Sequence, residues 1–181
     1  MNRAVFLDRD GVINRPAVRE GKSYPPESME DFSIYPDVAE ACARLKAAGF
    51  LIVVVTNQPD VGRGTQRREV VEAMHARMCA AVCIDRVEVC YDSEMSQLYK
   101  PATGMLLRAA SDLLLDLSSS FMVGDRWRDV DCGRAAGCTT IFIERGYRES
   151  LRQQPDYRAA SLGEATEIIL RRCQREGESC L

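Results

Sequence analysis

The sequence predicts an α/β fold: a Rossmann-like, doubly wound, mainly parallel sheet in three αβα layers. Short apolar runs typical of buried strands alternate with segments of helical period along the 181 residues. Polar residues or a glycine follow these runs, as expected where parallel strands end at one edge of a sheet. No repeat or change of composition marks a second domain. We therefore expect one domain over residues 1–174 and a polar tail over 175–181.

The first half of the chain is interpreted as two strands and two helices around a long loop. Residues 4–7 are an apolar run that enters a turn, which is typical of a buried strand. Residues 15–35 hold glycine and a proline pair and are too long for an ordinary connection. A helix is expected over 36–48, where a glycine ends it. The β-branched run 50–55 predicts a fully buried strand, and 66–82 has helical period.

The second half continues the alternation of strand and helix. A glycine closes the second of its three helices, and the strands are short and rich in β-branched or aromatic residues. The expected strands are 86–90, 120–123 and 139–143, and the expected helices are 103–115, 128–136 and 162–173.

Composition excludes several functional classes. The net charge of −3 predicts no nucleic-acid partner, because a basic surface is absent. We expect no signal peptide, no membrane span, a cytoplasmic location and a monomer. The eight cysteines include no C-x-x-C pair and are interpreted as core residues or free thiols. His75, the single histidine, is expected to be structural, on the surface of a helix or half-buried.

The candidate functional residues follow the predicted strands. Asp8 and Asp10 stand two residues apart directly after the first strand, and Gly11 follows as a turn. Two like charges at the edge of a sheet repel each other, and a bound cation with an anionic substrate relieves that repulsion. The same edge is expected to hold further residues at strand ends or helix starts: Thr56, Asn57, Lys100, Asp125 and Asp129.

Each of these residues also has a purely structural interpretation. A strand that ends in a polar loop explains Asp8 and Asp10, and a simple turn explains Thr56. Lys100 is interpretable as a solvated lysine, and Asp129 as an acid at a helix N-terminus. Their combination, in this order and at these positions, favours a single phosphate-handling site.

The chain resembles the haloacid dehalogenase superfamily of phosphotransferases over about residues 3–147. The matching residues are Asp8-Arg9-Asp10-Gly11, Thr56-Asn57, Lys100-Pro101, and Gly124-Asp125 with Asp129. One branch is more similar than the rest, the cytosolic D-glycero-D-manno-heptose 1,7-bisphosphate phosphatases, to which histidinol-phosphate phosphatases are closely related. The similarity to this branch lies in the runs Asp8–Asn14 and Val54–Gln58 and in Arg63-Gly64.

The resemblance implies phosphoryl transfer through an aspartyl-phosphate. Asp8 is expected to be the nucleophile, since a carboxylate needs no deprotonation at pH 7. Asp10 is expected to protonate the leaving alcohol and then to deprotonate the water that hydrolyses the intermediate. Thr56 and Lys100 are expected to hold the phosphoryl oxygens.

The resemblance also implies a metal site and substrate contacts. Mg²⁺ is expected on Asp8, Asp125 and the backbone carbonyl of Asp10, with Asp129 supporting the metal shell. The expected substrate-binding residues are Asn57, Gln58, Arg63, Lys100 and Arg126. Trp127 is expected to pack the loop beside the metal site.

Two departures from the family bear on the substrate. The heptose phosphatases usually carry a Cys/His zinc loop before the lysine, but residues 90–99 hold one cysteine and no histidine, so we expect no zinc. The family's arginine before the lysine is Tyr99 here, and Arg126 or Arg63 is expected to compensate. The segment after the first strand is too short for a cap domain, which predicts an open, capless site with Lys22-Ser23-Tyr24 near the substrate.

The sequence therefore favours a Mg²⁺-dependent hydrolase that removes phosphate from a small phosphorylated sugar. The best single expectation is the 7-phosphate of D-glycero-D-manno-heptose 1,7-bisphosphate, within heptose biosynthesis. Histidinol phosphate or another small phosphomonoester is the alternative substrate. A non-catalytic phosphosugar-binding module is the alternative from a different functional class.

Overall fold

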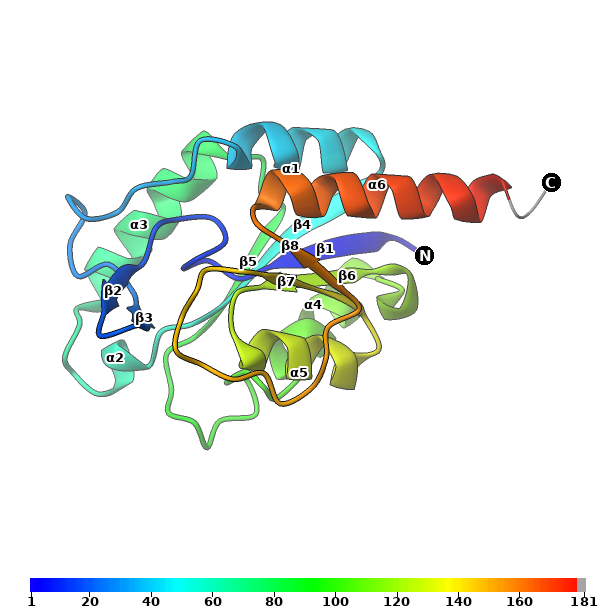
Figure 1. Cartoon of the computed structure of the whole chain (residues 1–181). Coiled ribbons are helices and arrows are strands. Elements are labelled where there is room, and N and C mark those ends of the chain that lie inside the picture. Colours follow the sequence, from blue (N-terminus) through cyan, green and yellow to red (C-terminus); the bar gives the residue numbers. More distant parts are fainter. Residues whose placement is uncertain (179–181) are drawn as a thin grey trace.

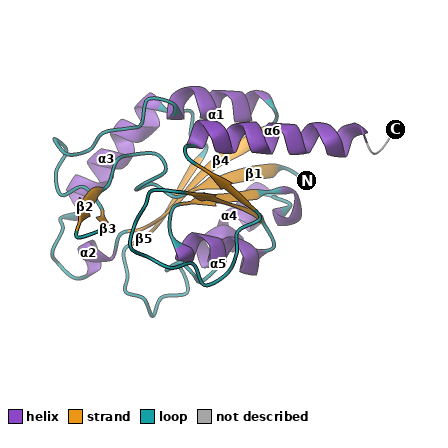
Figure 2. Ribbon diagram, in the orientation of Figure 1, coloured by secondary structure: helices purple, strands orange, loops and turns teal. Residues whose placement is uncertain are grey.

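A six-stranded sheet lies between two layers of helices in the computed structural model, which describes residues 1–178 (Figures 1 and 2). The strand order is β5-β4-β1-β6-β7-β8, and all neighbouring strands pair in parallel. The strands are β1 (Arg3–Leu7), β4 (Phe50–Asn57), β5 (Arg86–Cys90), β6 (Phe121–Gly124), β7 (Thr139–Ile143) and β8 (Tyr157–Ala159). With β1 near the centre, the chain winds outward on both sides, and the predicted doubly wound α/β fold is confirmed.

The helices cover both faces of this sheet. On one face lie α1 (Val38–Ala47), α3 (Arg68–Ala81) and α6 (Leu162–Glu178), and on the other lie α4 (Gly104–Leu113) and α5 (Trp127–Ala136). Figure 1 shows α1 and α6 side by side above the sheet, with α4 and α5 below it. The three αβα layers expected from the sequence are therefore present.

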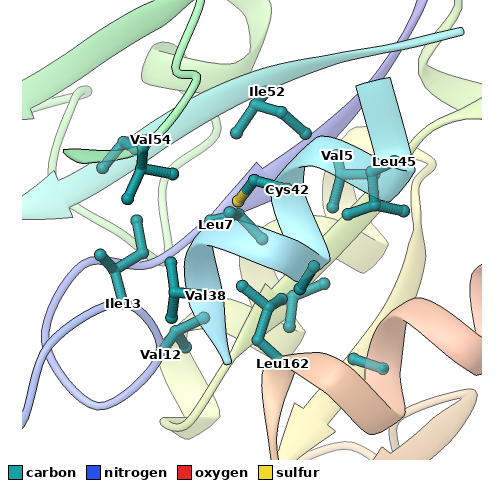
Figure 3. Packing of buried hydrophobic residues seen from close by; sticks show 14 of the residues in the cluster. Val5, Leu7, Val12, Ile13, Val38, Cys42, Leu45, Ile52, Val54 and Leu162 are labelled. Atoms are coloured by element: carbon teal, nitrogen blue, oxygen red, sulfur yellow. The ribbon is translucent and has the colours of Figure 1, made fainter. Parts of the chain in front are cut away.

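Burial on both faces explains why the strands are apolar without interruption. Val5 and Leu7 pack in the cluster beneath α1 and α6, as Figure 3 shows, whereas Ala4 and Phe6 belong to the cluster on the α4–α5 face. Successive side chains of a strand point to opposite faces, so a strand covered on both sides needs an apolar residue at every position.

The expected irregular segment 15–35 contains a small hairpin that the sequence reading missed. Strands β2 (Ala17–Arg19) and β3 (Lys22–Tyr24) pair antiparallel around a two-residue turn. Both turn residues, Glu20 and Gly21, have positive φ, at 52° and 76°, as the tight hairpin turns with the correct twist require. In Figure 1 the hairpin lies beyond the carboxyl ends of β1 and β4.

Other elements also differ from the sequence prediction. The glycine-bearing loop after β4 begins with a one-turn helix, α2 (Pro59–Gly62), and a short 3₁₀ turn, η1 (Leu117–Ser119), precedes β6. β8 is only three residues long and lacks an apolar run. α6 continues past the expected end at 173 to Glu178, and residues 179–181 of the expected polar tail lie outside the described residues.

The described residues contain no inserted cap domain. The segment between β1 and α1 carries only the hairpin, and the segment between β4 and α3 carries only α2. The carboxyl edge of the sheet is therefore open to ligands. Within residues 1–178 every helix is too short or too polar to cross a bilayer. The seven described cysteines are free thiols, and Cys180 lies outside the described part of the chain.

Candidate active site

Three neighbouring strands bring the predicted polar residues to one edge of the sheet. β1 leads into Asp8 and Asp10, and Leu7 lies in register with Val54 of β4 and Val123 of β6. The Asp8 amide donates to the Val123 carbonyl at 3.0 Å, which fixes the exit of β1 beside that of β6. Residues that directly follow these strands are therefore neighbours, as the sequence predicts.

A cleft of about 310 Å³ opens above this edge. Of the residues expected to act on the substrate, six line the cleft and two, Thr56 and Gln58, lie behind it. The lining residues are Asp8, Asp10, Ser23, Tyr24, Pro25, Asn57, Pro59, Asp60, Arg63, Glu94, Tyr99, Lys100, Arg126, Arg128 and Asp129. Of the segment Lys22-Ser23-Tyr24, which was expected near the substrate, Ser23 and Tyr24 line the cleft and Lys22 does not.

Lys100 lies between two carboxylates at the base of the cleft. Its Nζ is 2.9 Å from Oδ1 of Asp8 and 2.6 Å from Oδ1 of Asp129. Asn57 holds the Lys100 backbone from both sides: its Oδ1 accepts from the Lys100 amide at 3.0 Å, and its Nδ2 donates to the Lys100 carbonyl at 3.1 Å. Asn57 therefore positions Lys100, in addition to lining the cleft.

Asp125 is a buried carboxylate without a well-formed hydrogen bond. Neither of its oxygens accepts a bond of good geometry, although the nearby Tyr147 hydroxyl tends to lower its pKa. Gly11, at φ +91°, makes the position of Asp125 possible, because a Cβ on Gly11 would lie 1.7 Å from Asp125 Oδ2. An unpaired buried carboxylate is costly unless it coordinates a cation, so Asp125 is suited to a metal.

Asp8, Asp125 and Asp129 form one acidic cluster. One carboxylate oxygen from each lies within 4.8 Å of the other two. Both oxygens of Asp129 are already bonded, Oδ1 to Lys100 and Oδ2 to the Arg126 amide at 3.0 Å, where Asp129 caps the start of α5. Asp129 thus belongs to the cluster itself. Because both of its oxygens are bonded, Asp8 and Asp125 are the acids most available to a cation.

Burial dominates the electrostatics of this cluster. Desolvation raises the pKa of Asp8 to about 7, against the lowering effect of Lys100, and the nearby Asp129 and Asp10 raise it further. Burial, with Asp8 and Asp129, also raises the pKa of Asp125. Burial lowers the pKa of Lys100, but the Asp129 and Asp8 carboxylates outweigh it and raise the pKa above its usual value. Because the pKa values of two acids remain raised although Lys100 is charged, a further cation would stabilise the ionised form of these acids.

Asp10 is held by three side chains. Arg9 forms a forked ion pair with it at 2.9–3.2 Å, Asn14 donates to Oδ1 at 2.9 Å, and Gln58 donates to Oδ2 at 2.8 Å. Gln58 also donates to Thr56 Oγ1 at 2.9 Å, which leaves the Thr56 O–H as a donor. Both donors of the Gln58 amide are used, on Asp10 and on Thr56, so Gln58 positions these two residues, whereas a substrate contact was expected.

His75 extends this support into the interior. The expectation of a surface or half-buried histidine is wrong: its side chain is 7% exposed, and Nε2 lies 3.2 Å from Nη1 of Arg9. Arg9 can only donate, so Nε2 must accept, which places the proton on Nδ1, 3.8 Å from Glu72. Burial and the Arg9 charge lower the pKa of His75 to about 4, against the raising effect of Glu72 and Asp10.

His75 is expected to make the protein sensitive to acid. Its pKa is about 4 when folded and 6.5 when unfolded, so below pH 6.5 the unfolded chain binds a proton that the folded one excludes. The free energy of unfolding, compared with that of a His75→Gln variant, should fall by on the order of 2 kcal/mol between pH 7 and pH 5. Urea unfolding of both proteins at the two pH values measures this difference, and parallel changes would contradict the neutral His75.

The three arginines of the cleft all contact carboxylates. Arg126 pairs with Glu149 and donates to the Ser23 carbonyl at 3.4 Å, and Arg63 lies 3.2 Å from Asp60. Arg128, 3.2 Å from Glu94, was not predicted from the sequence. Its position in the first turn of the helix after Asp125, at the edge where ligands bind, was an available signal.

The loop between β5 and Lys100, residues 91–99, is tied to neighbouring elements by backbone hydrogen bonds. The backbone carbonyl of Tyr91 accepts from the Gly62 amide at 3.0 Å, and that of Gln97 accepts from the Gly104 amide at 3.1 Å. These bonds tie the loop to α2 and α4. Among the side chains that the structure describes, those of residues 1–175, the acidic cluster is the only group of three or more His, Cys, Asp or Glu placed to share a metal ion.

Comparisons with known proteins agree with this architecture. The HAD-hydrolase-like family matches residues 98–165. The chain is 35% identical to a D-glycero-D-manno-heptose-1,7-bisphosphate 7-phosphatase of Thermosynechococcus vestitus, over 92% of this chain and 94% of that protein. It is 34% identical to the protein of the same name in Chlorobaculum tepidum, over 90% and 92%.

A solved structure matches most of the fold. The D,D-heptose 1,7-bisphosphate phosphatase of B. bronchiseptica, complexed with magnesium and phosphate, superimposes with a TM-score of 0.79 at 24% identity, over 94% of this chain and 99% of that one. At this identity the likeness concerns the fold alone.

Proposed function

The chain belongs to the D,D-heptose 1,7-bisphosphate phosphatase family of HAD-like hydrolases, and we propose that it removes the 7-phosphate from D-glycero-D-manno-heptose 1,7-bisphosphate. The observation that best supports this proposal is the position of the Asp8 carboxylate, 2.9 Å from the Lys100 Nζ and beside Asp10 at the base of an open cleft. A nucleophile, a proton carrier and a fixed cation at one point are the parts that phosphoryl transfer needs.

Asp8 is assigned the nucleophilic attack on phosphorus. Its carboxylate attacks, the P–O bond to the sugar breaks, and an aspartyl-phosphate forms. The hydrogen bonds from the Arg9 amide, at 2.8 Å, and from Lys100 both reach Oδ1 and hold the carboxylate in one orientation. Because the carboxylate is already oriented, less entropy is lost when it attacks, and the activation free energy is lower.

Asp10 is assigned the proton transfers of both steps. It gives a proton to the leaving sugar oxygen, and it then takes one from the water that hydrolyses the aspartyl-phosphate. Arg9, Asn14 and Gln58 all act on its carboxylate oxygens, so the group cannot rotate away from the cleft without breaking these bonds.

Lys100 and Thr56 are assigned to the phosphoryl oxygens. The Lys100 ammonium is fixed by two carboxylates and by the Asn57 clamp on its backbone. The Thr56 hydroxyl is oriented by Gln58, which leaves its proton for an anion. Donors that are fixed before the reaction stabilise the charge of the transition state without reorganisation.

Asp8 and Asp125 are assigned to hold Mg²⁺, together with the backbone carbonyl of Asp10. The residues fit such an ion: the two Asp125 oxygens are buried without a well-formed hydrogen bond, and hard carboxylate oxygens are the ligands that Mg²⁺ prefers. When bound there, the ion would offset the charge of the phosphate and of the attacking carboxylate. We propose no zinc site.

The cleft suits a small substrate with more than one phosphate. It is open on the side where capped relatives of this fold class would carry a domain, and three arginines line it in addition to Lys100. We propose a monomer in a reducing compartment such as the cytoplasm, which the free thiols of the described cysteines fit.

A phosphate-release screen tests this function. With Mg²⁺ present, kcat/KM is measured for the heptose 1,7-bisphosphate, fructose 1,6-bisphosphate, histidinol phosphate and p-nitrophenyl phosphate, with chelated metal as the control. The heptose bisphosphate should lead by about tenfold or more. Histidinol phosphate in first place would overturn the substrate and keep the chemistry, whereas phosphosugar binding without any hydrolysis would overturn the enzyme in favour of a binding module.

A further inference from the structure

Arg128 is a cleft residue to which the chemistry above gives no task. It stands in the first turn of α5, three residues after Asp125. Its guanidinium carbon lies 4.8 Å from the centre of the Trp127 ring and 5.7 Å from that of Tyr99. Because Tyr99 directly precedes Lys100, this contact holds Arg128 next to the base of the cleft.

The contacts of Arg128 leave its hydrogen-bond donors largely unused. Its Nε is buried without a partner, and its ion pair is a single contact of 3.2 Å from Nη2 to Glu94, a side chain that is 59% exposed. Aromatic rings bind the face of a guanidinium, whereas a phosphate binds the N–H groups in its plane. The two rings can therefore fix Arg128 without occupying the groups that recognise an anion.

Two of the other cations of the cleft, Lys100 and Arg126, are more fully engaged, and the third, Arg63, is more exposed. Lys100 is held by Asp8 and Asp129, and Arg126 bonds both Glu149 and the Ser23 carbonyl. Arg63, whose side chain is 53% exposed, directly follows the short helix α2 and pairs with Asp60 of that helix. Arg128 combines partial burial, at 26% exposure, with unused donors.

We propose that Arg128 is the specificity-determining residue that binds the second, non-reacting phosphate of the substrate. The assignment rests on the proposed bisphosphate function. The second phosphate takes the in-plane N–H groups of Arg128 and displaces Glu94, whose exposed carboxylate returns to solvent. Arg128, rather than Arg126 or Arg63, thus supplies the cation that is absent at Tyr99.

The test compares two substrates that differ only in the second phosphate, heptose 1,7-bisphosphate and heptose 7-phosphate. In Arg128→Gln, kcat/KM for the bisphosphate should fall about 10- to 100-fold, mainly through KM, which corresponds to the loss of a charge-assisted contact. The value for the 7-phosphate should stay within about twofold. Arg128→Lys keeps the charge without the planar fork and should fall between these two proteins.

Matched variants make the result decisive. Arg134→Gln removes an arginine from the same helix, outside the cleft, and should behave as the wild type on both substrates. Glu94→Gln removes the competing carboxylate and should lower KM for the bisphosphate alone, a readout that does not depend on the folding of an Arg128 variant.

Two outcomes would overturn the assignment. Equal losses on both substrates in Arg128→Gln would place Arg128 at the reacting phosphate or in the fold, and an unchanged preference would give it no part in specificity. A wild-type enzyme that does not distinguish the two substrates would instead overturn the proposed bisphosphate function, and the assignment with it.

Discussion

Replacement of Asp8 by asparagine is expected to lower phosphate release by a factor on the order of 10⁴ or more. The amide is not a nucleophile toward phosphorus, and the neighbouring carboxylates have other roles, Asp125 as the proposed metal ligand. Asp10 is fixed by three donors, and Asp129 is bonded through both oxygens. Steady-state phosphate release with Mg²⁺ measures the loss, and retained turnover would contradict the mechanism.

The same substitution should not unfold the protein. The folded pKa of Asp8, about 7, lies above its unfolded value of 3.8, so its charge destabilises the metal-free fold increasingly as the pH rises between these values. Asparagine resembles the neutral form. The metal-free variant at pH 8 should therefore be at least as stable as the wild type, which thermal unfolding measures, and an inactive but folded variant assigns the lost rate to chemistry.

Replacement of Asp10 by asparagine is expected to slow turnover of the sugar phosphate about 10²- to 10⁴-fold. The loss should depend on the leaving group. A sugar alkoxide needs a proton to depart, whereas p-nitrophenolate does not, so the first step with p-nitrophenyl phosphate should be affected least. Hydrolysis of the aspartyl-phosphate still needs the base, and the variant should release one equivalent of nitrophenol in a burst and then turn over slowly.

Stopped-flow measurement of nitrophenol release resolves the two phases. Asp31→Asn, which changes an exposed acid outside the cleft, serves as the control and should match the wild type. A uniform loss on both substrates without a burst would remove Asp10 from the proton transfers and reduce it to a structural acid.

The sequence predicted which residues meet at the carboxyl edge of the sheet, because their positions follow from where strands end. Asp8, Thr56 and Asp125 each stand directly after an apolar run, and parallel strands end at a common edge. Lys100 precedes its helix at the same edge. The placement of these residues depends only on where strands and helices begin and end, which hydrophobic periodicity reveals.

Roles that depend on contacts between distant segments were not predictable in this way. Gln58 was expected to touch substrate from the resemblance to the family, but it donates to Asp10, 48 residues earlier in the chain. The contact between Arg9 and His75 spans 66 residues. The Gln58 contact depends on how the loops after β1 and β4 meet, and the His75 contact on how α3 packs on the sheet, and no local pattern encodes either.

The shortest strands were not predicted from the sequence for a related reason. β8 and the β2–β3 hairpin each contain strands of only three residues, too few for a period to show. β8 is held at the sheet edge by pairing with β7 and by Asp156, whose carboxylate accepts from the Thr140 amide at 2.8 Å. Tertiary pairing, rather than local propensity, makes these residues strands.

Trapping of the phosphoenzyme tests the central claim most directly. The wild-type enzyme is mixed with the heptose bisphosphate and Mg²⁺, quenched in acid within milliseconds, digested, and the peptide that contains residues 8 and 10 is analysed by mass spectrometry. The account predicts one phosphoryl group on Asp8, absent from Asp8→Asn and enriched in Asp10→Asn. A phosphoryl group on any other residue, or none during rapid turnover, would contradict it.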